Sequence, residues 1–373
     1  MIAVQVSEQS QVAEARRAAT RLAQRVGFDE AAVGRAAIAA TELATNLVKH
    51  GRGGRLLAGL SDAPDAEGGR RVRSRAEDGS AGIELVAIDQ GPGIADLDAA
   101  LRDGFSTAGS AGRGLGAVRR QAHAFHIYSR PGAGTAILAR LGAGRPPPRA
   151  TDADESSDAS NTRASTALDG GWGAVCVPKP GEEVCGDDWH VRSSPGMPRG
   201  SDRTAMVVDG LGHGPQAAEA AATVVRLFND RAGLSPAAIM EALHAGLRAT
   251  RGAAVSIARF DRARRVVVFC GIGNVAGALV SRATGQTRRL LSHNGTVGHA
   301  VRRIQEVEYP YPDAADAPAV VLHSDGLSAN WSLAAYPGLL EGHPSLLAAV
   351  LYRDFARDRD DATVLVAHET GKG

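Results

Sequence analysis

Apolar residues recur at helical spacing early in the chain, and short apolar runs follow further along. Residues 12–26 carry apolar side chains three and four positions apart, which predicts an amphipathic helix. Asp29 offers an N-cap for a second helix, rich in Ala and Leu, which we expect to run to about His50 and to stop at Gly51. Strands are expected at 56–60, 83–88 and 136–139. Helices and strands in this order predict an α+β sandwich.

The second half of the chain alternates strand-like and helix-like intervals. Apolar runs typical of strands occupy 204–208, 255–260, 265–270, 275–280, 318–322 and 364–367. Helical patterns cover 216–228 and 236–250. Together they predict a sandwich of sheets flanked by helices.

Two polar intervals have little to bury. Residues 61–80 are expected to form a long surface loop between two strands. Residues 141–168, with three consecutive prolines followed by Ser, Asp, Thr and Ala, cannot repay the entropy of ordering and predict a flexible linker. We therefore divide the 373 residues into a domain at 1–140, this linker and a domain at 169–370.

Composition narrows the classes of function. The 42 basic and 41 acidic side chains nearly cancel, which argues against a nucleic-acid partner. No apolar run reaches the roughly 18 residues that a membrane span needs, and the first residues lack the layout of a secretory signal. Three cysteines without metal-ligand spacing suit a reducing compartment. We expect a cytoplasmic protein with no membrane partner.

Four features in the first domain suggest a nucleotide site. Glu42 and Asn46 lie one helical turn apart, where a carboxylate can act as a base and an amide oxygen can bind magnesium, although a solvated helix face would look the same. Asp89 follows an apolar strand and precedes Gly91 and Gly93; it could accept a hydrogen bond from an exocyclic amine, or the segment could be an ordinary turn.

The other two features are glycine-rich. Residues 109–116 precede a helical pattern, so backbone N–H groups there could cradle phosphates, with charge added by one arginine. Its candidate residues are Gly112, Arg113, Gly114 and Gly116. Thr135 precedes the next strand, and its hydroxyl could support Asp89.

In this order and spacing, these motifs resemble the GHKL ATPase superfamily, and within it the small serine kinases of bacterial partner-switching systems. The stretch from Asp89 to Thr107 is most similar to the stressosome switch kinase. The resemblance implies Mg-ATP binding, with Glu42 as general base, Asn46 as magnesium ligand and Asp89 as adenine reader. The glycines would wrap the phosphates.

In the second domain, four acidic turns lie far apart in sequence, and most of them adjoin an apolar strand. They contain Asp187, Asp209 with Gly210, Asp325, and the doublet Asp360 and Asp361. Clustered carboxylate oxygens, with a backbone carbonyl at a glycine, suit Mg²⁺ or Mn²⁺, and two such ions can activate a water for in-line attack on phosphorus. Each turn alone could be a simple hairpin. Nearby, His213 either contacts phosphate or caps the helix that starts near Pro215, and we favour the cap.

The second half resembles the PPM phosphatases of the SpoIIE type, over residues 170–368. The segments Asp209–Gly214, Gly271–Val275, His293–Gly298 and Ser324–Gly326 are most similar to the stressosome feedback phosphatase. The resemblance implies two Mn²⁺ or Mg²⁺ ions held by Asp187, Asp209, Gly210, Asp325 and either Asp360 or Asp361. Cys185 stands where the family usually has glycine.

The two resemblances together predict a bifunctional regulator of a partner-switching pathway. Its phosphatase would hydrolyse phosphoserine or phosphothreonine on a small regulatory protein of the STAS or antagonist type, in a pathway that controls a sigma factor. Its ATP domain would act as a serine kinase. Two alternatives remain open: a phosphatase whose ATP domain only senses nucleotide or docks a partner, and a non-catalytic protein that sequesters a sigma factor or its antagonist.

Overall fold

The computed structural model describes residues 1–61, 82–101, 114–144, 146, 171–193, 203–231, 233–311 and 318–368. Most of the expected loop at 61–80 and of the expected linker at 141–168 lies outside these residues. The chain forms two compact units, one built mainly from the residues before Gly171 and one from the residues after it. Among the described residues, no helix is both long and apolar enough to cross a membrane.

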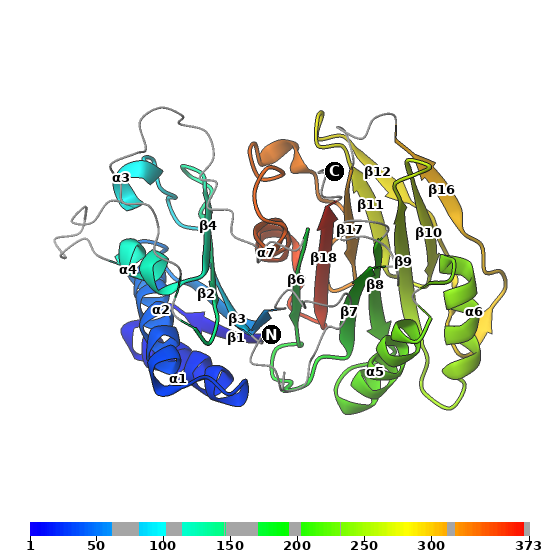
Figure 1. The fold of residues 1–373 in the computed structure, drawn as a ribbon, viewed down its shortest axis with the longest axis horizontal. Coiled ribbons are helices and arrows are strands. Elements are labelled where there is room, and N and C mark those ends of the chain that lie inside the picture. The colour runs from blue at the N-terminus through cyan, green and yellow to red at the C-terminus, as the bar shows by residue number, and fades with distance from the viewer. Residues whose placement is uncertain are drawn as a thin grey trace. The chain divides into compact units, whose positions relative to one another are not determined.

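The first unit is an antiparallel sheet covered on one face by helices (Figure 1). Its five described strands lie in the order β1-β2-β3-β5-β4, and they are β1 (Ile2–Val6), β2 (Gly54–Ser61), β3 (Gly82–Asp89), β4 (Ala124–Ser129) and β5 (Thr135–Leu141). Its described helices are α1 (Gln9–Arg25), α2 (Glu30–Lys49), α3 (Leu97–Leu101) and α4 (Gly114–Gln121). The pattern of hydrophobic residues did not reveal the edge strands β1 and β4, since few of their side chains are buried.

Helix α2 carries the first candidate site, and its local sequence explains its limits. Asp29 is its N-cap, as predicted, with a carboxylate oxygen that accepts a hydrogen bond from the Ala32 N–H at 2.7 Å. The helix ends at Lys49, just before Gly51. Its buried face is mostly alanine and leucine, and small side chains let it pack closely between α1 and the sheet.

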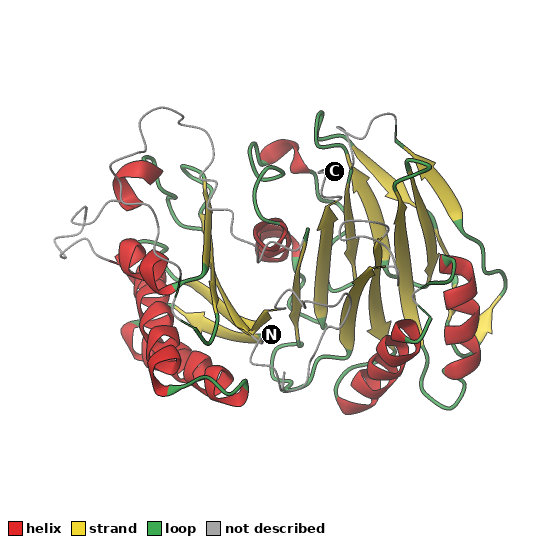
Figure 2. Cartoon of the chain, viewed as in Figure 1, coloured by secondary structure: helices red, strands yellow, loops and turns green. Residues whose placement is uncertain are grey.

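The second unit contains two stacked sheets (Figure 2). The first sheet has the order β13-β10-β9-β8-β7, with β16 on β10; its strands are β7 (Asp187–Ser193), β8 (Arg203–Gly210), β9 (Ala253–Asp261), β10 (Val266–Ile272), β13 (Ser292–His293) and β16 (Val307–Pro310). The second has the order β12-β11-β17-β18-β6; its strands are β6 (Trp172–Val177), β11 (Ala276–Val280), β12 (Thr287–Leu290), β17 (Ala319–His323) and β18 (Ala362–His368). A small ribbon pairs β14 (Gly295–Thr296) with β15 (Ala300–Val301).

Helices cover the outer faces of the two sheets. Helices α5 (Pro215–Asn229) and α6 (Pro236–Gly246) share a core with β8, β9 and β10, while α7 (Pro344–Phe355) packs on β6 and β18. At Gly173 of β6, a Cβ atom would lie 2.1 Å from the Ser345 backbone nitrogen, so α7 approaches this strand more closely than any side chain would allow. The unit is therefore a four-layer α-β-β-α sandwich.

The sequence did not show that consecutive strands belong to different sheets. All of β10 pairs with β9, whereas β11 pairs with β12 and β17 in the opposite sheet. The crossing occurs at Gly273, whose φ of 93° favours glycine. Apolar side chains from both sheets, such as Val207, Phe269 and Leu365, fill the space between the sheets. Because the chain passes from one sheet to the other here, segments far apart in sequence end near one edge of the sandwich.

Candidate functional site

The predicted base and the predicted magnesium ligand face the start of α4. Glu42 and Asn46 are half-buried on one face of α2. A Cβ atom on Gly114, the first residue of α4, would lie 3.2 Å from Glu42 Oε2 and 3.4 Å from Asn46 Oδ1. The Nδ2 atom of Asn46 is buried without a hydrogen-bond partner among the described residues. The structure thus brings Glu42, Asn46 and Gly114 together.

The remaining phosphate-loop predictions have different outcomes. Gly116 is buried in α4, two residues into the helix. Gly112 and Arg113 lie outside the described residues.

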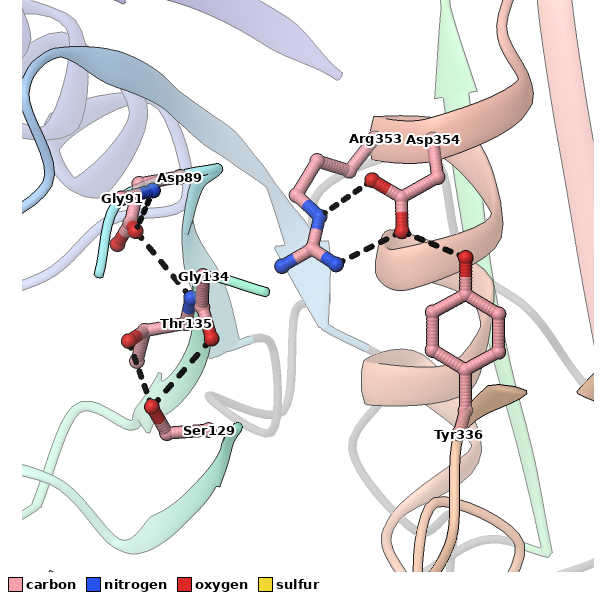
Figure 3. A network of polar contacts seen from close by, with 8 residues as sticks. All are labelled: Asp89, Gly91, Ser129, Gly134, Thr135, Tyr336, Arg353 and Asp354. Atoms are coloured by element: carbon pink, nitrogen blue, oxygen red, sulfur yellow. Dashed lines mark hydrogen bonds and ion pairs between the residues drawn. The ribbon is translucent and has the colours of Figure 1, made fainter. Parts of the chain in front are cut away.

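Asp89 ends β3 and is held by backbone N–H groups (Figure 3). Its Oδ1 accepts hydrogen bonds from the Gly91 N–H at 2.8 Å and the Thr135 N–H at 3.2 Å. We expected the Thr135 hydroxyl to support Asp89, and this was wrong. The hydroxyl lies 2.8 Å from the Ser129 hydroxyl instead, because Thr135 is the register partner of Asp89 and its N–H, rather than its side chain, points across the ladder.

The glycines after Asp89 are required by close backbone contacts. A Cβ atom on Gly91 would lie 2.8 Å from the Gly51 carbonyl oxygen, and one on Gly93 would lie 2.1 Å from the Arg130 carbonyl oxygen. Ser129 also accepts a hydrogen bond from the Ile94 N–H at 2.8 Å. Sequence reasoning missed Ser129 altogether and saw in Gly51 only a helix stop, since neither belongs to a motif by itself.

In the second unit, Asp187 and Asp209 lie opposite each other on neighbouring antiparallel strands, β7 and β8. Asp187 is 3% exposed, and its Oδ2 has no hydrogen-bond partner among the described residues. Burial, and then the Asp209 charge, raises the pKa of Asp187 well above its ordinary value. Burial, followed by the charges of Asp325, Asp360 and Asp361, raises the pKa of Asp209 to about 8. Two carboxylates with raised pKa values therefore lie side by side on neighbouring strands.

Asp325 follows β17 and is oriented by an asparagine that the sequence analysis did not single out as a site residue. The Asn274 Nδ2 donates a hydrogen bond to Asp325 Oδ2 at 2.5 Å. Burial raises the pKa of Asp325; Asn274 opposes the rise and the charge of Asp360 adds to it. The signal was present in the quoted segment Gly271–Val275, where Asn274 is the one polar side chain.

Asp360 and Asp361, the two residues just before β18, lie in different environments. Asp361 is 3% exposed, and its two oxygens accept hydrogen bonds from the Lys179 N–H at 2.8 Å and the Gly186 N–H at 2.9 Å. Asp360 is exposed, and its Oδ1 accepts a hydrogen bond from the adjacent Asp361 N–H at 2.9 Å. A Cβ atom on Gly326 would lie 2.0 Å from the Asp361 carbonyl oxygen, so this turn contacts the one that carries Asp325.

Gly210 and His213 belong to the loop after β8. The Gly210 N–H donates to the Gly186 carbonyl at 3.1 Å, which links the turns of Asp187 and Asp209. The preference for His213 as a helix cap was wrong. Gly214, with a φ of 72°, is the N-cap of α5, and His213 Nδ1 lies 2.9 Å from Glu182 Oε1.

The donor set fits hard divalent cations. Within the part of the chain that the structure describes, no three His, Cys, Asp or Glu side chains are placed so that they could together hold a metal ion. The carboxylates are nevertheless close enough to interact: the charge of Asp209 raises the pKa of Asp187, and the charges of Asp325 and Asp360 raise the pKa of Asp209. The charge of Asp360 also raises the pKa of Asp325. A divalent cation would offset the repulsion between these carboxylates and would give the buried Asp187 oxygen a partner. Because all the candidate ligands are oxygen atoms, Mg²⁺ or Mn²⁺ fits the site.

The folds and sites define a two-domain protein that joins a histidine kinase-like ATP-binding sandwich to a PPM-type phosphatase sandwich. The sequence model of the histidine kinase-like ATPase domain matches residues 6–141, and that of stage II sporulation protein E (SpoIIE) matches residues 200–369. The serine/threonine-protein kinase RsbT of Bacillus subtilis (strain 168) is 32% identical over 136 residues, which cover 36% of this chain and 92% of that protein. Through its N-terminal domain, the chain belongs to the RsbT family of histidine kinase-like ATPases.

Two solved structures also align with the chain. RsbX in complex with magnesium is 22% identical, with a TM-score of 0.44, and covers 53% of this chain and 94% of its own. The PP2C phosphatase domain of SpoIIE from Bacillus subtilis, solved with a fragment of its regulatory domain, is 15% identical, with a TM-score of 0.43. That alignment covers 83% of this chain and 82% of the SpoIIE chain.

Proposed function

We propose that this protein is a bifunctional partner-switching regulator. Its second domain hydrolyses phosphoserine or phosphothreonine on a small regulatory protein of the STAS or antagonist type. Its first domain binds Mg-ATP and phosphorylates a serine or threonine of that protein. Both directions of one switch would then lie on one chain, and the tether would keep both sites at a high effective concentration near their target.

The observation that best supports the phosphatase is the pairing of Asp187 with Asp209. Two carboxylates opposite each other on neighbouring strands, one of them with an orphaned buried oxygen, are costly unless a cation lies between them. When bound, two Mg²⁺ or Mn²⁺ ions supply charge neutralisation for the phosphoryl group and an activated water. We assign the ligands to Asp187, Asp209, the Gly210 carbonyl, Asp325 and Asp360.

Asp360 is preferred to Asp361 as the last ligand because of hydrogen bonding. Both oxygens of Asp361 already accept backbone N–H groups, whereas Asp360 is exposed. In this assignment Asp361 holds the turns together and Asp360 faces the ion. Asn274 keeps Asp325 in place for the same purpose.

The first domain supports nucleotide binding through three groups of residues. Asp89, held rigid by two N–H donors, would accept the exocyclic amine of adenine, with Gly91, Gly93 and Thr135 shaping its surroundings. Asn46 would contribute to magnesium binding, and Glu42 would take the proton of the attacked hydroxyl. Gly114 and Gly116, with Gly112 and Arg113, would surround the phosphates at the start of α4.

The test uses the whole protein and its Asp209→Asn variant with labelled ATP, Mn²⁺ and a candidate antagonist protein. We expect phosphorylated antagonist to accumulate with the variant and to be turned over by the wild type. A Glu42→Gln variant serves as the control: it should bind ATP and transfer no label.

Two results would replace the proposal. Phosphatase activity without any transfer of label, altered by nucleotide, would favour an ATP-sensing phosphatase. A wild type that binds its partner but neither adds nor removes phosphate would favour a sequestering protein.

A further inference from the structure

His323 is the last residue of β17 and lies two positions before Asp325. It is 1% exposed, and both of its ring nitrogens have partners. The Trp331 indole Nε1 lies 3.2 Å from His323 Nε2, and His323 Nδ1 lies 2.9 Å from the Ser324 carbonyl oxygen. An indole N–H can only donate, so Nε2 must accept and the ring hydrogen must be on Nδ1, which donates to Ser324. The imidazole therefore joins Trp331 to the peptide group that precedes Asp325.

Trp331 is itself held in place from another strand. The guanidinium of Arg289, on β12, lies 4.6 Å from the centre of the indole ring. The same guanidinium donates hydrogen bonds to the carbonyl oxygens of Ala329 and Trp331, the latter at 3.3 Å. Trp331 is 3% exposed, so the indole is fixed between the buried histidine and this arginine.

The near side of the same loop is fixed by β18 and α7. The Ser324 N–H donates to the Thr363 carbonyl, and the Thr363 N–H donates to the Ser324 hydroxyl oxygen, each at 3.0 Å. The Ser328 N–H donates to the Phe355 carbonyl at 2.9 Å. Residues 324–331 are therefore attached at both ends, and the His323 side chain connects Trp331, at the far end, to the peptide that precedes Asp325.

We propose that the His323–Trp331 hydrogen bond, with Arg289 stacked on the indole, is a positioning device for Asp325. It sets the orientation of the 324–325 peptide, so that the Asp325 carboxylate would be held in place before an ion binds. This inference rests on the proposed metal-dependent phosphatase. Groups that orient a metal ligand without touching the metal typically contribute 10–100-fold in metal affinity.

The test is a calorimetric titration of the full-length protein with MnCl₂, together with turnover of a phosphorylated peptide as a function of Mn²⁺ concentration. Trp331→Phe keeps an aromatic ring beneath Arg289 and removes the indole donor. We expect Mn²⁺ affinity to fall about 10-fold or more, and excess Mn²⁺ to restore most of the turnover. Arg289→Gln, at an exposed position, should shift affinity in the same direction by less.

Trp172→Phe is the matched control. Trp172 also lies beneath an arginine, with Arg203 4.8 Å from its ring, but it pairs with Ala367 at the end of β18 remote from the acidic doublet. Unchanged Mn²⁺ affinity in both Trp331→Phe and Arg289→Gln, or an equal loss in Trp172→Phe, would overturn the positioning role. A wild type that binds no Mn²⁺ would instead overturn the proposed function on which the inference rests.

Discussion

At the scale of single residues, the adjacent carboxylates Asp360 and Asp361 are chemically identical but differ in their surroundings. Asp361 is enclosed and accepts two backbone N–H groups from the 179–186 segment, whereas Asp360 is exposed. A hydrogen bond to a charged group typically contributes about 1.5–3 kcal/mol to stability. The difference between the two side chains is therefore large enough to measure.

We expect Asp361→Asn to lower the free energy of unfolding of the metal-free second domain by roughly 2 kcal/mol relative to Asp360→Asn. An amide at 361 places an NH₂ group against one of the two N–H donors. Each variant removes one negative charge from the cluster, so the lost hydrogen bonds are the main difference between the two. Denaturant unfolding followed by fluorescence measures it, and phosphatase assays should show that Asp360→Asn loses Mn²⁺-dependent turnover. Equal stabilities would contradict the division of roles.

At the scale of elements, helix α2 has one tightly packed face and one position, Gly34, where there is room for a side chain. Gly34 lies within the helix, and a Cβ atom there would meet nothing within 4 Å. Glycine inside a helix costs about 0.5–1 kcal/mol relative to alanine, because it loses more backbone entropy on folding. No contact in the described structure requires glycine at this position.

Gly34→Ala should therefore raise the free energy of unfolding of the first domain by about 0.5–1 kcal/mol. Nucleotide affinity should stay the same, since Gly34 lies two helical turns before Glu42. Chemical denaturation and ATP titration test the two parts separately. Gly114→Ala provides the contrast, because its Cβ atom would lie 3.2 Å from Glu42 Oε2 and should weaken ATP binding. A destabilised Gly34→Ala protein would show that the position has a packing role.

At the scale of the whole molecule, buried histidines couple folding of the second unit to pH. His368 ends β18 and is 7% exposed. Burial, and then the charges of Arg282 and His343, lowers the pKa of His368 to about 3. In the unfolded chain its pKa is near 6.5. At pH values between these two pKa values, the imidazole of His368 is therefore protonated in the unfolded state and neutral in the folded state.

The stabilising contribution of a neutral, buried His368 should be fully present above pH 6.5 and should fall as the pH drops toward 3. The contribution of His368 over this range is roughly 3–5 kcal/mol. His368→Gln should flatten the decline, whereas His299→Gln, at an exposed histidine, should not. Thermal unfolding at a series of pH values measures both. An unchanged pH profile in His368→Gln would mean that other groups account for the acid sensitivity.

The sequence alone was sufficient for features that depend on local periodicity and on turn chemistry. Helix α2 with its Asp29 cap, the buried strands β3, β8 and β17, and the two-domain architecture follow from apolar spacing, because burial on one face imposes that spacing wherever an element packs. The acidic turns after strands were also visible. The edge strands β1 and β4 were not, since edge positions are only partly buried and leave a weak pattern.

Only the tertiary structure decided which of these residues meet. The register that places Asp187 opposite Asp209, the contact of Gly114 with Glu42 and the bond from Lys179 to Asp361 all join distant segments; the last spans 182 positions. Strand register depends on how whole sheets stack, and a side chain's role depends on the donors around it. Local sequence encodes neither, so it identified the candidate carboxylates while packing alone separated Asp361, which holds the turns, from Asp360, which we assign to the metal.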